Sequence, residues 1–386
     1  MMTAAPVTGA PQKGQKSMPV IVLTGGGSAG HVTPNLALVP ELKKRGYDIH
    51  YIGSYDGIEK TLAEQAGLPY TGIATGKLRR YFSLKNLTDP ARVLKGANQA
   101  ARALKKIKPA AVFSKGGFVG APVVWAAHRM GIPCVIHEAD LTPGLANKLC
   151  FSSADRVLCN FPETLKYLPE GRSLVSGCPV RAELFTGNKQ AGLDFLGFDD
   201  TKPLLMVVGG SLGAVAVNEA VWKALPELLK DFNVVHLVGK GKGDENVKAD
   251  GYRQFEYISR ELPDLFAAAD LVVSRAGANA IFEFVALKKP NILIPLWTSA
   301  SRGDQVLNAE SFKKHGYSMV LSQEGLTPEI LTEAVRTLHA DPSSYIAAMS
   351  ASPQANAIPT ICDTIEQVIR EKNHERPDKK KDPDEM

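Results

Sequence analysis

The chain has 386 residues, more than one ordinary domain holds, so two domains are expected. Hydrophobic residues make up 44% of it, charged residues 22%, and the formal net charge is +5, which is typical of a globular protein. No apolar run reaches the roughly 18 residues of a membrane-spanning helix. Residues 1–17 are polar and lack an apolar core, so they predict a disordered leader rather than a secretory signal, and residues 372–386 predict a disordered charged tail.

The two halves of the chain differ in charge. Residues 1–180 contain 22 Lys and Arg against 11 Asp and Glu, a net charge of +11, whereas the remainder contains 23 against 29, a net charge of −6. A basic first half indicates an anionic partner. The segment 76–87 interleaves four cations with aromatic and apolar side chains, which suits an anionic membrane surface or a loop that packs its aromatics inward. No nucleic-acid-binding module is visible, so nucleic acid is not expected as a partner.

Cysteine and histidine patterns give no sign of a disulfide framework or a metal site. The five cysteines are scattered, odd in number and without a Cys-x-x-Cys pair, as expected for reduced thiols in the cytosol. The eight histidines are dispersed, and the only Asp-x-Asp, Asp382 to Asp384, lies in the charged tail. Neither a metal nor a cofactor is predicted.

Strands and helices alternate along the first half of the chain. Short β-branched or apolar runs predict the strands, and the segments between them predict the helices. Strands are expected at 20–24, 48–53, 111–114, 133–136, 156–160 and 173–176, and helices near 34–45, 57–66, 90–107, 119–130, 143–152 and 162–166. This alternation indicates an α/β fold with parallel sheets and helices on both faces.

The first predicted strand leads into a turn with four glycines, at positions 25, 26, 27 and 30, followed by His31. Pro34 stands where a helix could begin. Glycines let the backbone approach a ligand closely, and a helix N-terminus offers unpaired N–H groups to an anion. The turn therefore predicts a phosphate or diphosphate cradle, with His31 as a general base or as a group that hydrogen-bonds the loop.

The glycine turn also matches the dinucleotide fingerprint Gly25-x-Gly27-x-x-Gly30. That fingerprint requires an acidic residue at the end of the second strand, where it holds a ribose. Here the second strand, 48–54, ends in glycine and serine, with its aspartate at the wrong end. An NAD-dependent oxidoreductase is therefore disfavoured.

Two further motifs follow strands of the first half. Residues 114–122 form a second glycine turn, Ser-Lys-Gly-Gly-Phe-Val-Gly-Ala-Pro. The strand ending at 136 leads into His-Glu-Ala-Asp, which makes Glu138 and Asp140 candidates for acid–base chemistry or for binding sugar hydroxyls. The alternative is helix capping by Asp140 or Thr142.

The strand–turn–helix pattern then begins again. A break at 177–181 and a polar stretch at 186–192, interpreted as a possible linker, precede an apolar strand and a third glycine turn at 204–214. Further strands are expected at 234–239, 271–274 and 291–295. Two Rossmann-like domains in tandem are therefore predicted, with the ligand between them at the carboxyl ends of the strands.

The second half carries its own candidate binding groups. Ser211 and nearby backbone N–H groups suit a diphosphate, and Arg181 could neutralise a departing one. Gly277 precedes a helix in which Glu283 follows Asn279 by one turn, where a carboxylate could accept two ribose hydroxyls. Amide side chains in Asp304-Gln305-x-x-Asn308 suit sugar hydroxyls.

Taken together, these motifs resemble those of the MurG family, which is part of glycosyltransferase family 28. The resemblance covers about residues 19–369. It is carried by seven motifs in order, Gly26-Gly-Ser-Ala-Gly-His-Val-x-Pro34, Lys115-Gly-Gly-Phe-Val-Gly-Ala-Pro122, His137-Glu138 with Pro143-Gly-Leu-x-Asn147-Lys, Gly177-x-Pro-Val-Arg181, Gly209-Gly-Ser-x-Gly-Ala214, Ser274-Arg-Ala-Gly277 to Glu283, and Asp304-Gln-x-x-Asn308-Ala.

The resemblance implies the GT-B fold, with an acceptor domain at 18–180, a donor domain at 181–350 and a helix at 351–371 that crosses back. It implies inverting transfer of GlcNAc from UDP-GlcNAc to the muramoyl C4 hydroxyl of lipid I, giving lipid II for peptidoglycan and hence for cell-wall growth, cell shape and division. The enzyme would be peripheral, on the cytoplasmic face of the cell membrane, with cell-wall and division proteins as further partners. No cofactor is implied, and whether a divalent cation stimulates the reaction is not readable from the sequence.

The resemblance also implies roles for individual residues. His31 is the expected base, with Glu138 as the second choice. The donor contacts would come from Ser28, Ala29, Gly30, Asp140, Arg181, Ser211, Ile258, Gly277, Ala278, Asn279, Ala280, Ile281, Phe282, Glu283 and Gln305, with Ile258 beside the uracil, Glu283 on the ribose and Gln305 on the GlcNAc hydroxyls.

Four positions depart from the common family pattern, namely Ala29, Phe118, Asp140 and Cys178. Ala29 replaces a glycine, so the backbone there must keep a negative φ or accept strain. Phe118 cannot donate a proton, and a carboxylate at Asp140 would repel a diphosphate. Other readings remain open at this point, namely another GT-B glycosyltransferase or a non-catalytic sugar-nucleotide-binding protein of the division machinery.

Overall fold

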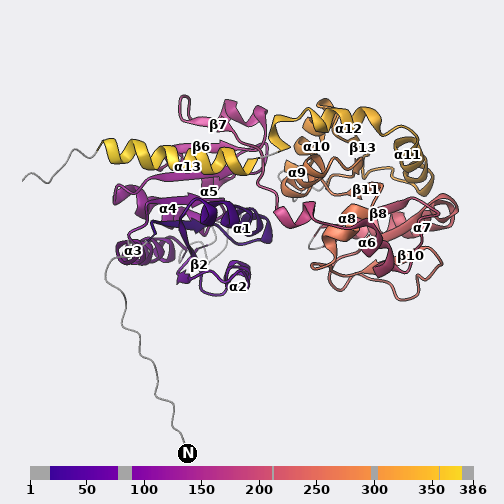
Figure 1. Cartoon of the computed structure of the whole chain (residues 1–386), viewed down its shortest axis with the longest axis horizontal. Helices are drawn as coiled ribbons and strands as arrows, with labels where there is room; N and C mark the ends of the chain where they lie inside the picture. The colour runs from indigo at the N-terminus through magenta and orange to yellow at the C-terminus, as the bar shows by residue number, and fades with distance from the viewer. Residues whose placement is uncertain (1–17, 77–88, 211–212, 297–302, 356, 376–386) are drawn as a thin grey trace, which may run out of the picture.

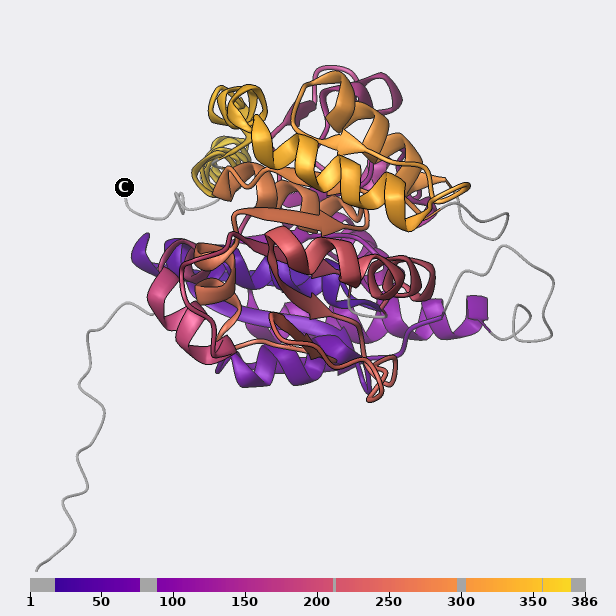
Figure 2. The ribbon, with the colours of Figure 1, turned by 90° about the vertical axis from the view of Figure 1, so that its right-hand side faces the viewer.

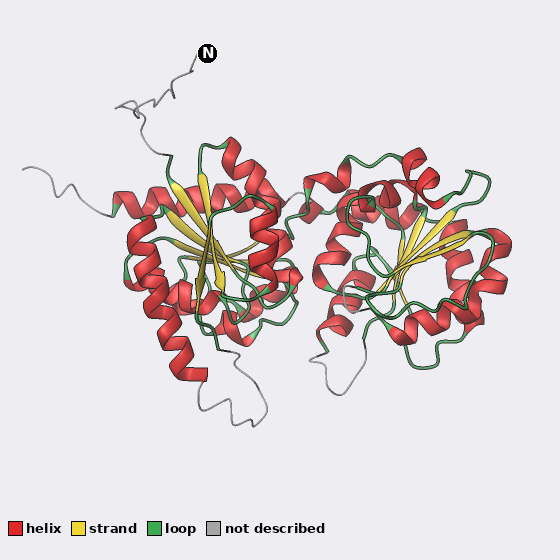
Figure 3. Ribbon diagram, turned by 90° about the horizontal axis from the view of Figure 1, so that it is seen from below, coloured by secondary structure: helices red, strands yellow, loops and turns green. Residues whose placement is uncertain are grey.

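The computed structural model describes residues 18–76, 89–210, 213–296, 303–355 and 357–375. The predicted leader, nearly all of the basic segment 76–87, Ser211 and most of the predicted tail lie outside these residues. Two lobes lie side by side, each built around a central sheet with helices on both sides (Figures 1 and 3). The expected α/β class with two parallel sheets is confirmed.

The first sheet has seven parallel strands in the order β3-β2-β1-β4-β5-β6-β7. The second has six parallel strands in the order β10-β9-β8-β11-β12-β13. Their bounds are β1 Val20–Thr24, β2 Asp48–Ser54, β3 Tyr70–Ile73, β4 Ala111–Ser114, β5 Cys134–Glu138, β6 Arg156–Cys159, β7 Ser173–Val175, β8 Leu204–Val208, β9 Asn233–Leu237, β10 Tyr252–Phe255, β11 Leu271–Ser274, β12 Asn291–Leu293 and β13 Met319–Val320.

Helices fill the connections between these strands. The α-helices are α1 Ala29–Lys44, α2 Ile58–Gln65, α3 Asp89–Ile107, α4 Gly120–Arg129, α5 Leu145–Lys148, α6 Lys189–Leu196, α7 Val215–Asp231, α8 Leu262–Ala268, α9 Ala278–Leu287, α10 Asp304–Lys314, α11 Pro328–Ala340, α12 Ser343–Ser350 and α13 Ala357–His374, and the 3₁₀ helices are Phe151–Ser153, Pro162–Tyr167, Ala182–Phe185 and Pro353–Ala355. Within the described part of the chain, none of these helices is long and apolar enough to cross a bilayer.

Each sheet is buried on both faces. In β1, Ile21 and Leu23 pack with α1 and α13, whereas Val22 packs with residues of α3 and α4 on the opposite face. Successive side chains of a strand point to opposite faces, so a strand between two helical layers must be apolar throughout. This explains why the strands read as continuous apolar runs rather than as alternating ones.

The last helix, α13, returns from the second lobe and packs on the first sheet beside α1, where Figure 1 shows it in yellow. Ile361, Ile365 and Val368 enter the core of the first domain. Arg45 Nη1 lies 2.6 Å from Asp363 Oδ1, which adds an ion pair between α1 and α13. The helix begins at Ala357 rather than at residue 351, and it continues three residues into the segment expected to be a disordered tail.

Several local predictions were wrong. Helix α1 begins at Ala29, so Pro34 lies inside it rather than at its start. The supposed linker at 186–192 contains the start of α6, whose N-cap Asn188 accepts a hydrogen bond of 2.9 Å from the N–H of Ala191. The predicted helix at 143–152 is reduced to the four residues of α5 and a 3₁₀ turn.

Three strands were not predicted, namely β3, β10 and β13. All three are edge strands: β3 is one edge of the first sheet, and β10 and β13 are the two edges of the second. The other edge of the first sheet, β7, was predicted. Edge strands are covered less completely than central ones, and β3 and β10 contain glycine or charged residues, so no apolar run marks them.

Candidate active site at the domain interface

The three glycine turns and the acidic motif all follow the carboxyl ends of strands, β1, β4 and β5 in the first sheet and β8 in the second. The turn after β11 leads into α9 in the same way. In parallel α/β sheets this edge is where ligands bind. Side chains from the two domains meet here, and Figure 2 shows the molecule end-on with the second domain in front of the first.

The first glycine turn is packed tightly against the second. Gly25 and Gly27 have φ values of +135° and +87°, which favour glycine. A Cβ on Gly27 would collide with the ring of Phe118, and one on Gly117 would collide with the carbonyl of Gly26. The aromatic ring at 118 therefore covers the first turn, a packing role that phenylalanine fills without a hydroxyl.

His31 lies in the first turn of α1, partly exposed. Its Nδ1 is 2.8 Å from Ser28 Oγ, and Ser28 is the N-cap residue of the helix. Ala29 is the first helical residue and does not have a positive φ, so the conformation required of an alanine at this position is met. Ser28, Ala29, Gly30 and His31 are thus presented together at one helix N-terminus.

Glu59 is a buried acidic residue beside the site that the sequence interpretation missed. Its buried carboxylate accepts hydrogen bonds from the N–H of Gly27, at 3.2 Å, and from the N–H of Ser54, at 3.1 Å, as well as from the Ser54 hydroxyl. The acid absent from the end of β2 is therefore supplied by α2, but it binds the protein and not a ribose. The N–H of Gly27, which belongs to the predicted phosphate cradle, therefore already donates to a carboxylate of the protein itself.

Glu138, at the end of β5, is also almost completely buried. Its carboxylate accepts hydrogen bonds from the N–H groups of Ala139, at 3.0 Å, Asp140, at 3.2 Å, and Gly144, at 3.0 Å, and from Asn147 Nδ2, at 2.8 Å. Burial raises the pKa of Glu138, and the Asn147 amide opposes that rise. This arrangement fixes the course of residues 139–144.

That loop reaches the second domain at α10. The N–H of Leu141 donates to Asn308 Oδ1 at 3.2 Å, and Thr142 Oγ1 donates to Asp304 Oδ1 at 2.8 Å. Asn308 Nδ2 lies 3.4 Å from Asp140 Oδ1. Asp140 therefore contributes to the contact between domains, and Thr142 acts across the interface rather than as a helix cap.

Helix α9 presents its N-terminus to this interface, with Gly277 as the N-cap. Within an α-helix the N–H groups of the first residues have no helical acceptor, which leaves those of Ala278, Asn279 and Ala280 for other partners. The N–H of Ile281 already donates to Gly277 O at 3.2 Å. The Ile281 and Phe282 side chains are buried, so neither presents its side chain at the surface.

Asn279 joins three segments. Its Nδ2 donates to the carbonyl of Gly30 at 2.8 Å, and its Oδ1 accepts from Cys178 Sγ at 3.2 Å. Cys178 belongs to the segment that passes from the first domain to the second. The domains also share an apolar contact, since the ring of Phe282 lies 5.2 Å from that of Phe161, in an edge-to-face arrangement.

Glu283 and Arg181 come together at the same helix. Arg181 Nη2 lies 3.4 Å from Glu283 Oε1, and the Glu283 side chain is 18% exposed. Burial raises the pKa of Glu283, and the Arg181 guanidinium partly offsets this. Arg181 Nε is buried and has no hydrogen-bond partner among the described residues.

The remaining predicted donor residues are placed in the second domain. Ile258 is buried in the core that contains α9. Gln305 Oε1 accepts a hydrogen bond of 2.9 Å from the N–H of Leu296, which follows β12, so its carbonyl is already engaged within the second domain. Ser211 lies outside the described residues. No group of His, Cys, Asp and Glu that could hold a metal occurs in the described ranges.

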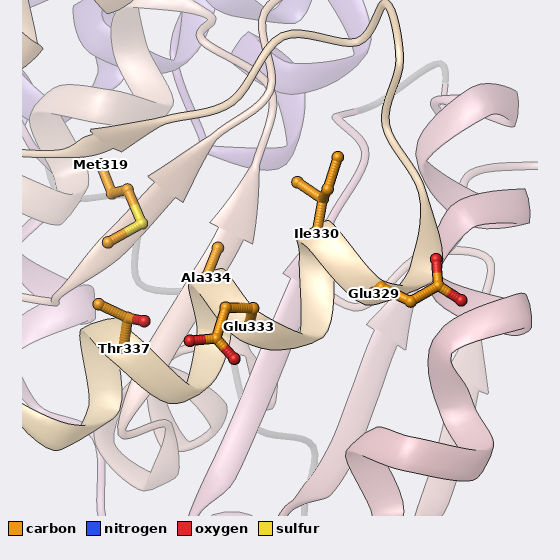
Figure 4. A pocket seen from close by; sticks show the side chains of 6 residues that line it. All are labelled: Met319, Glu329, Ile330, Glu333, Ala334 and Thr337. Carbon is orange, nitrogen blue, oxygen red and sulfur yellow. The ribbon is translucent and has the colours of Figure 1, made fainter.

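A surface pocket elsewhere differs from this site. It has a volume of about 450 Å³ and lies between β13 and α11 (Figure 4). Its lining is formed by Met319, Glu329, Ile330, Glu333, Ala334 and Thr337. None of these is a candidate site residue, so the chemistry is assigned to the domain interface.

Comparisons with known proteins agree with this architecture. Residues 21–159 match the glycosyltransferase family 28 N-terminal domain, and residues 204–365 match the family 28 C-terminal domain. Relatives named UDP-N-acetylglucosamine–N-acetylmuramyl-(pentapeptide) pyrophosphoryl-undecaprenol N-acetylglucosamine transferase occur in Lachnospira eligens, at 62% identity, and in Lachnoclostridium phytofermentans, at 59%. Each alignment covers 90% of this chain, and 99% and 98% of the respective relative.

Solved structures give the same result for the fold. A crystal structure of MurG from Acinetobacter baumannii matches with a TM-score of 0.72 and 26% identity, over 90% of this chain and 99% of that one. The calicheamicin glycosyltransferase CalG4 matches with a TM-score of 0.65 at 16% identity, over 92% of this chain and 99% of that one, which shows a shared fold alone. The expected GT-B architecture is confirmed. The chain belongs to glycosyltransferase family 28.

Proposed function

We propose that this chain transfers N-acetylglucosamine from UDP-GlcNAc to the muramoyl C4 hydroxyl of lipid I, with inversion, and so produces lipid II for peptidoglycan synthesis. The observation that carries the proposal is the N-terminus of α9, with Arg181 and Glu283, facing the His31 turn across the domain interface. A sugar-nucleotide site on one domain thereby faces an acid–base group on the other. The name of the 62% identical relative gives UDP-N-acetylglucosamine, an N-acetylmuramyl-(pentapeptide) pyrophosphoryl-undecaprenol and N-acetylglucosamine transfer.

The donor is bound by the second domain. The diphosphate lies at the N-terminus of α9, where the N–H groups of residues 278–280 and the Arg181 guanidinium compensate its charge. Glu283 accepts the ribose hydroxyls, Ile258 lies beside the uracil, and the Gln305 side chain contacts the GlcNAc hydroxyls. Ser211 and residues 28–30 complete the diphosphate site. No cofactor takes part, and assays with added Mg²⁺ or EDTA test whether a divalent cation stimulates the reaction.

His31 is the base. In this role the ring takes the tautomer in which Nδ1 donates to Ser28 Oγ, 2.8 Å away, and the lone pair of Nε2 accepts the proton of the acceptor hydroxyl. The C4 oxygen forms a bond to the anomeric carbon as the bond from that carbon to the UDP oxygen breaks, and UDP departs with the electron pair. Ser28 then stabilises the imidazolium. Glu138 is the second choice, because its carboxylate already accepts four hydrogen bonds from residues 139–147.

The enzyme works at the cytoplasmic face of the cell membrane as a peripheral protein, where its lipid-linked acceptor is found. The net charge of +11 in residues 1–180 supports contact with anionic headgroups, and the segment 76–87 supplies cations among apolar side chains. Proteins of cell-wall synthesis and division are its further partners. Sedimentation with vesicles of increasing anionic-lipid content tests the membrane contact, which should weaken as salt is added.

The decisive experiment measures transfer of labelled GlcNAc to a lipid I analogue. The unchanged enzyme should form the disaccharide product, and His31→Ala should lower kcat by about 10²- to 10⁴-fold. His128→Ala, on the exposed side of α4, is the matched control and should leave kcat unchanged. Near-normal kcat in a folded His31→Ala variant would remove His31 from the role of base. Failure to make product from any UDP-sugar would reject the proposed function.

A further inference from the structure

Lys115 is a completely buried lysine that the proposed mechanism does not use. It follows β4 as the first residue of the second glycine turn, and its N–H donates to Thr24 O at 3.0 Å. Its Nζ lies 2.6 Å from Nδ1 of His137, which is itself completely buried. A lysine is rarely buried to this extent unless it is paired, so the contact with His137 indicates a specific role for this amine.

The contacts on the two sides of the His137 ring together show which nitrogen carries the hydrogen. Nε2 lies 2.9 Å from the carbonyl oxygen of Gly177 and 3.1 Å from Ser176 Oγ. A carbonyl oxygen only accepts hydrogen bonds, so Nε2 carries the hydrogen and Nδ1 accepts from Lys115 Nζ. Burial lowers the pKa of His137 well below its usual value, and the Lys115 charge lowers it further, which keeps the ring neutral.

Gly177 lies where the chain passes from the first domain to the second. Its φ is +76°, and a Cβ there would lie 2.6 Å from the carbonyl oxygen of Gln354. The next residue is Cys178, whose Sγ contacts Asn279, and Asn279 contacts Gly30. Polar contacts therefore connect Lys115, through the crossing segment 176–178, to the donor helix α9.

Two carboxyl groups influence the amine. Burial lowers the pKa of Lys115, whereas Glu138 and Asp140 raise it. Glu138 is the last residue of β5, and Asp140 lies in the loop that follows it.

We propose that Lys115 is a positioning residue for glycosyl transfer, which holds His137 in the Nε2–H form and thereby fixes the crossing segment 176–178 that seats Asn279 and the N-terminus of α9. The inference rests on the proposed function, since it concerns the donor site of that reaction. Lys115 itself touches neither substrate. Its loss leaves Nδ1 of His137 without its donor and lets the crossing segment and α9 move relative to the first domain.

The test uses Lys115→Met, which keeps the length of the side chain and removes the donor. Lys60→Met, on the exposed side of α2, is the matched control. In ¹⁵N-histidine spectra, His137 of the unchanged protein should show a single neutral Nε2–H form, and Lys115→Met should shift it to a mixture. The affinity for UDP, measured by calorimetry, and kcat/KM for UDP-GlcNAc should both fall about tenfold, mainly through KM. Lys115→Gln, which retains an N–H donor, should recover part of this loss.

Three results would overturn the proposal. The first is an unchanged His137 spectrum in Lys115→Met. The second is an affinity of Lys115→Met for UDP within twofold of that of the unchanged protein. The third is a full additional loss when Lys115→Met is introduced into a His137→Phe background, because a residue that acts through His137 has nothing left to act on there. If Lys115→Met does not fold, the same three measurements on Lys115→Leu, which also lacks a donor, decide. The spectra and UDP titrations do not depend on lipid I, so failure of the proposed transfer would be seen separately.

Discussion

Asn279 in α9 donates a hydrogen bond of 2.8 Å from its Nδ2 to the backbone carbonyl of Gly30 in α1, and so joins the two domains at the candidate site. In an uninterrupted helix the carbonyl of residue 30 accepts from the N–H of residue 34. Residue 34 is a proline inside α1 and has no N–H. The proline thus leaves the carbonyl of Gly30 without a donor from its own helix, and Asn279 of the second domain supplies the missing hydrogen bond.

Replacing Asn279 with alanine should weaken donor binding. The change removes a hydrogen bond between the domains and the acceptor of Cys178 Sγ, so α9 is no longer held against the His31 turn. A loss of about tenfold in kcat/KM for UDP-GlcNAc is expected, the size of one hydrogen bond. Steady-state kinetics with varied donor checks it. Asn246→Ala, in an exposed loop, is the control, and equal kinetics in the two variants would contradict the prediction.

Replacing Glu59 with glutamine should destabilise the first glycine turn. The carboxylate accepts from the N–H groups of Gly27 and Ser54, one on each oxygen, whereas glutamine would place its NH₂ against one of these donors. The free energy of unfolding should fall by about 1–3 kcal/mol. Urea denaturation measures it, with Glu64→Gln on the exposed face of α2 as the control. Identical midpoints for both variants would show that the buried carboxylate does not hold the turn.

Replacing Glu283 with alanine should raise KM for UDP-GlcNAc by about tenfold or more while affecting kcat less, because ribose contacts act in the ground state as well as the transition state. It should also leave Arg181 without its carboxylate partner. Initial rates over a range of donor concentrations separate the two constants. Glu310→Ala, exposed on α10, serves as the comparison. An unchanged KM would remove Glu283 from the nucleotide site.

The change of donor binding with pH should be set by the carboxyl group of Glu283. Because burial raises the pKa of Glu283, the side chain takes up its proton at a pH where an ordinary glutamate is still ionised. KM for UDP-GlcNAc should therefore rise as the pH falls through this raised pKa, and Glu283→Gln should abolish the rise. Arg181 opposes the shift, so Arg181→Met should move the rise to higher pH.

Stability should show the corresponding linkage. A carboxyl group whose pKa is raised by folding contributes stability that is present at low pH and is lost as the pH rises through the folded-state pKa. The difference in unfolding free energy between the unchanged protein and Glu283→Gln should therefore grow in favour of the glutamine variant as the pH rises. Denaturation at several pH values checks the sign, and a difference that grows in the opposite direction would contradict burial as the cause.

Much of the fold could be predicted from local rules. The strand–turn–helix units were recognisable because buried parallel strands must be apolar and because turns with positive φ, as at Gly116 and Gly117, favour glycine. Boundaries were less predictable. Pro34 lies inside α1 against the usual rule for helix interiors, and the carbonyl of Gly30 that it leaves without a helical donor accepts from Asn279, which follows Gly30 by 249 residues.

The sequence by itself determined the parallel α/β architecture, which follows from the apolar strand pattern. It also determined the order of the motifs, whose residues stand close together in the chain and which resemble those of glycosyltransferase family 28. Only the tertiary structure decided what the polar side chains do. Glu59 was absent from the prediction because its partner Gly27 is 32 positions away. Lys115 was named only as part of a motif, because its partner His137 is 22 positions away. No local pattern encodes such a pair. The contacts exist because parallel strands bring their carboxyl ends to one edge of the sheet. Residues distant in the chain are buried there together, and their polar groups must form hydrogen bonds with one another because water is excluded.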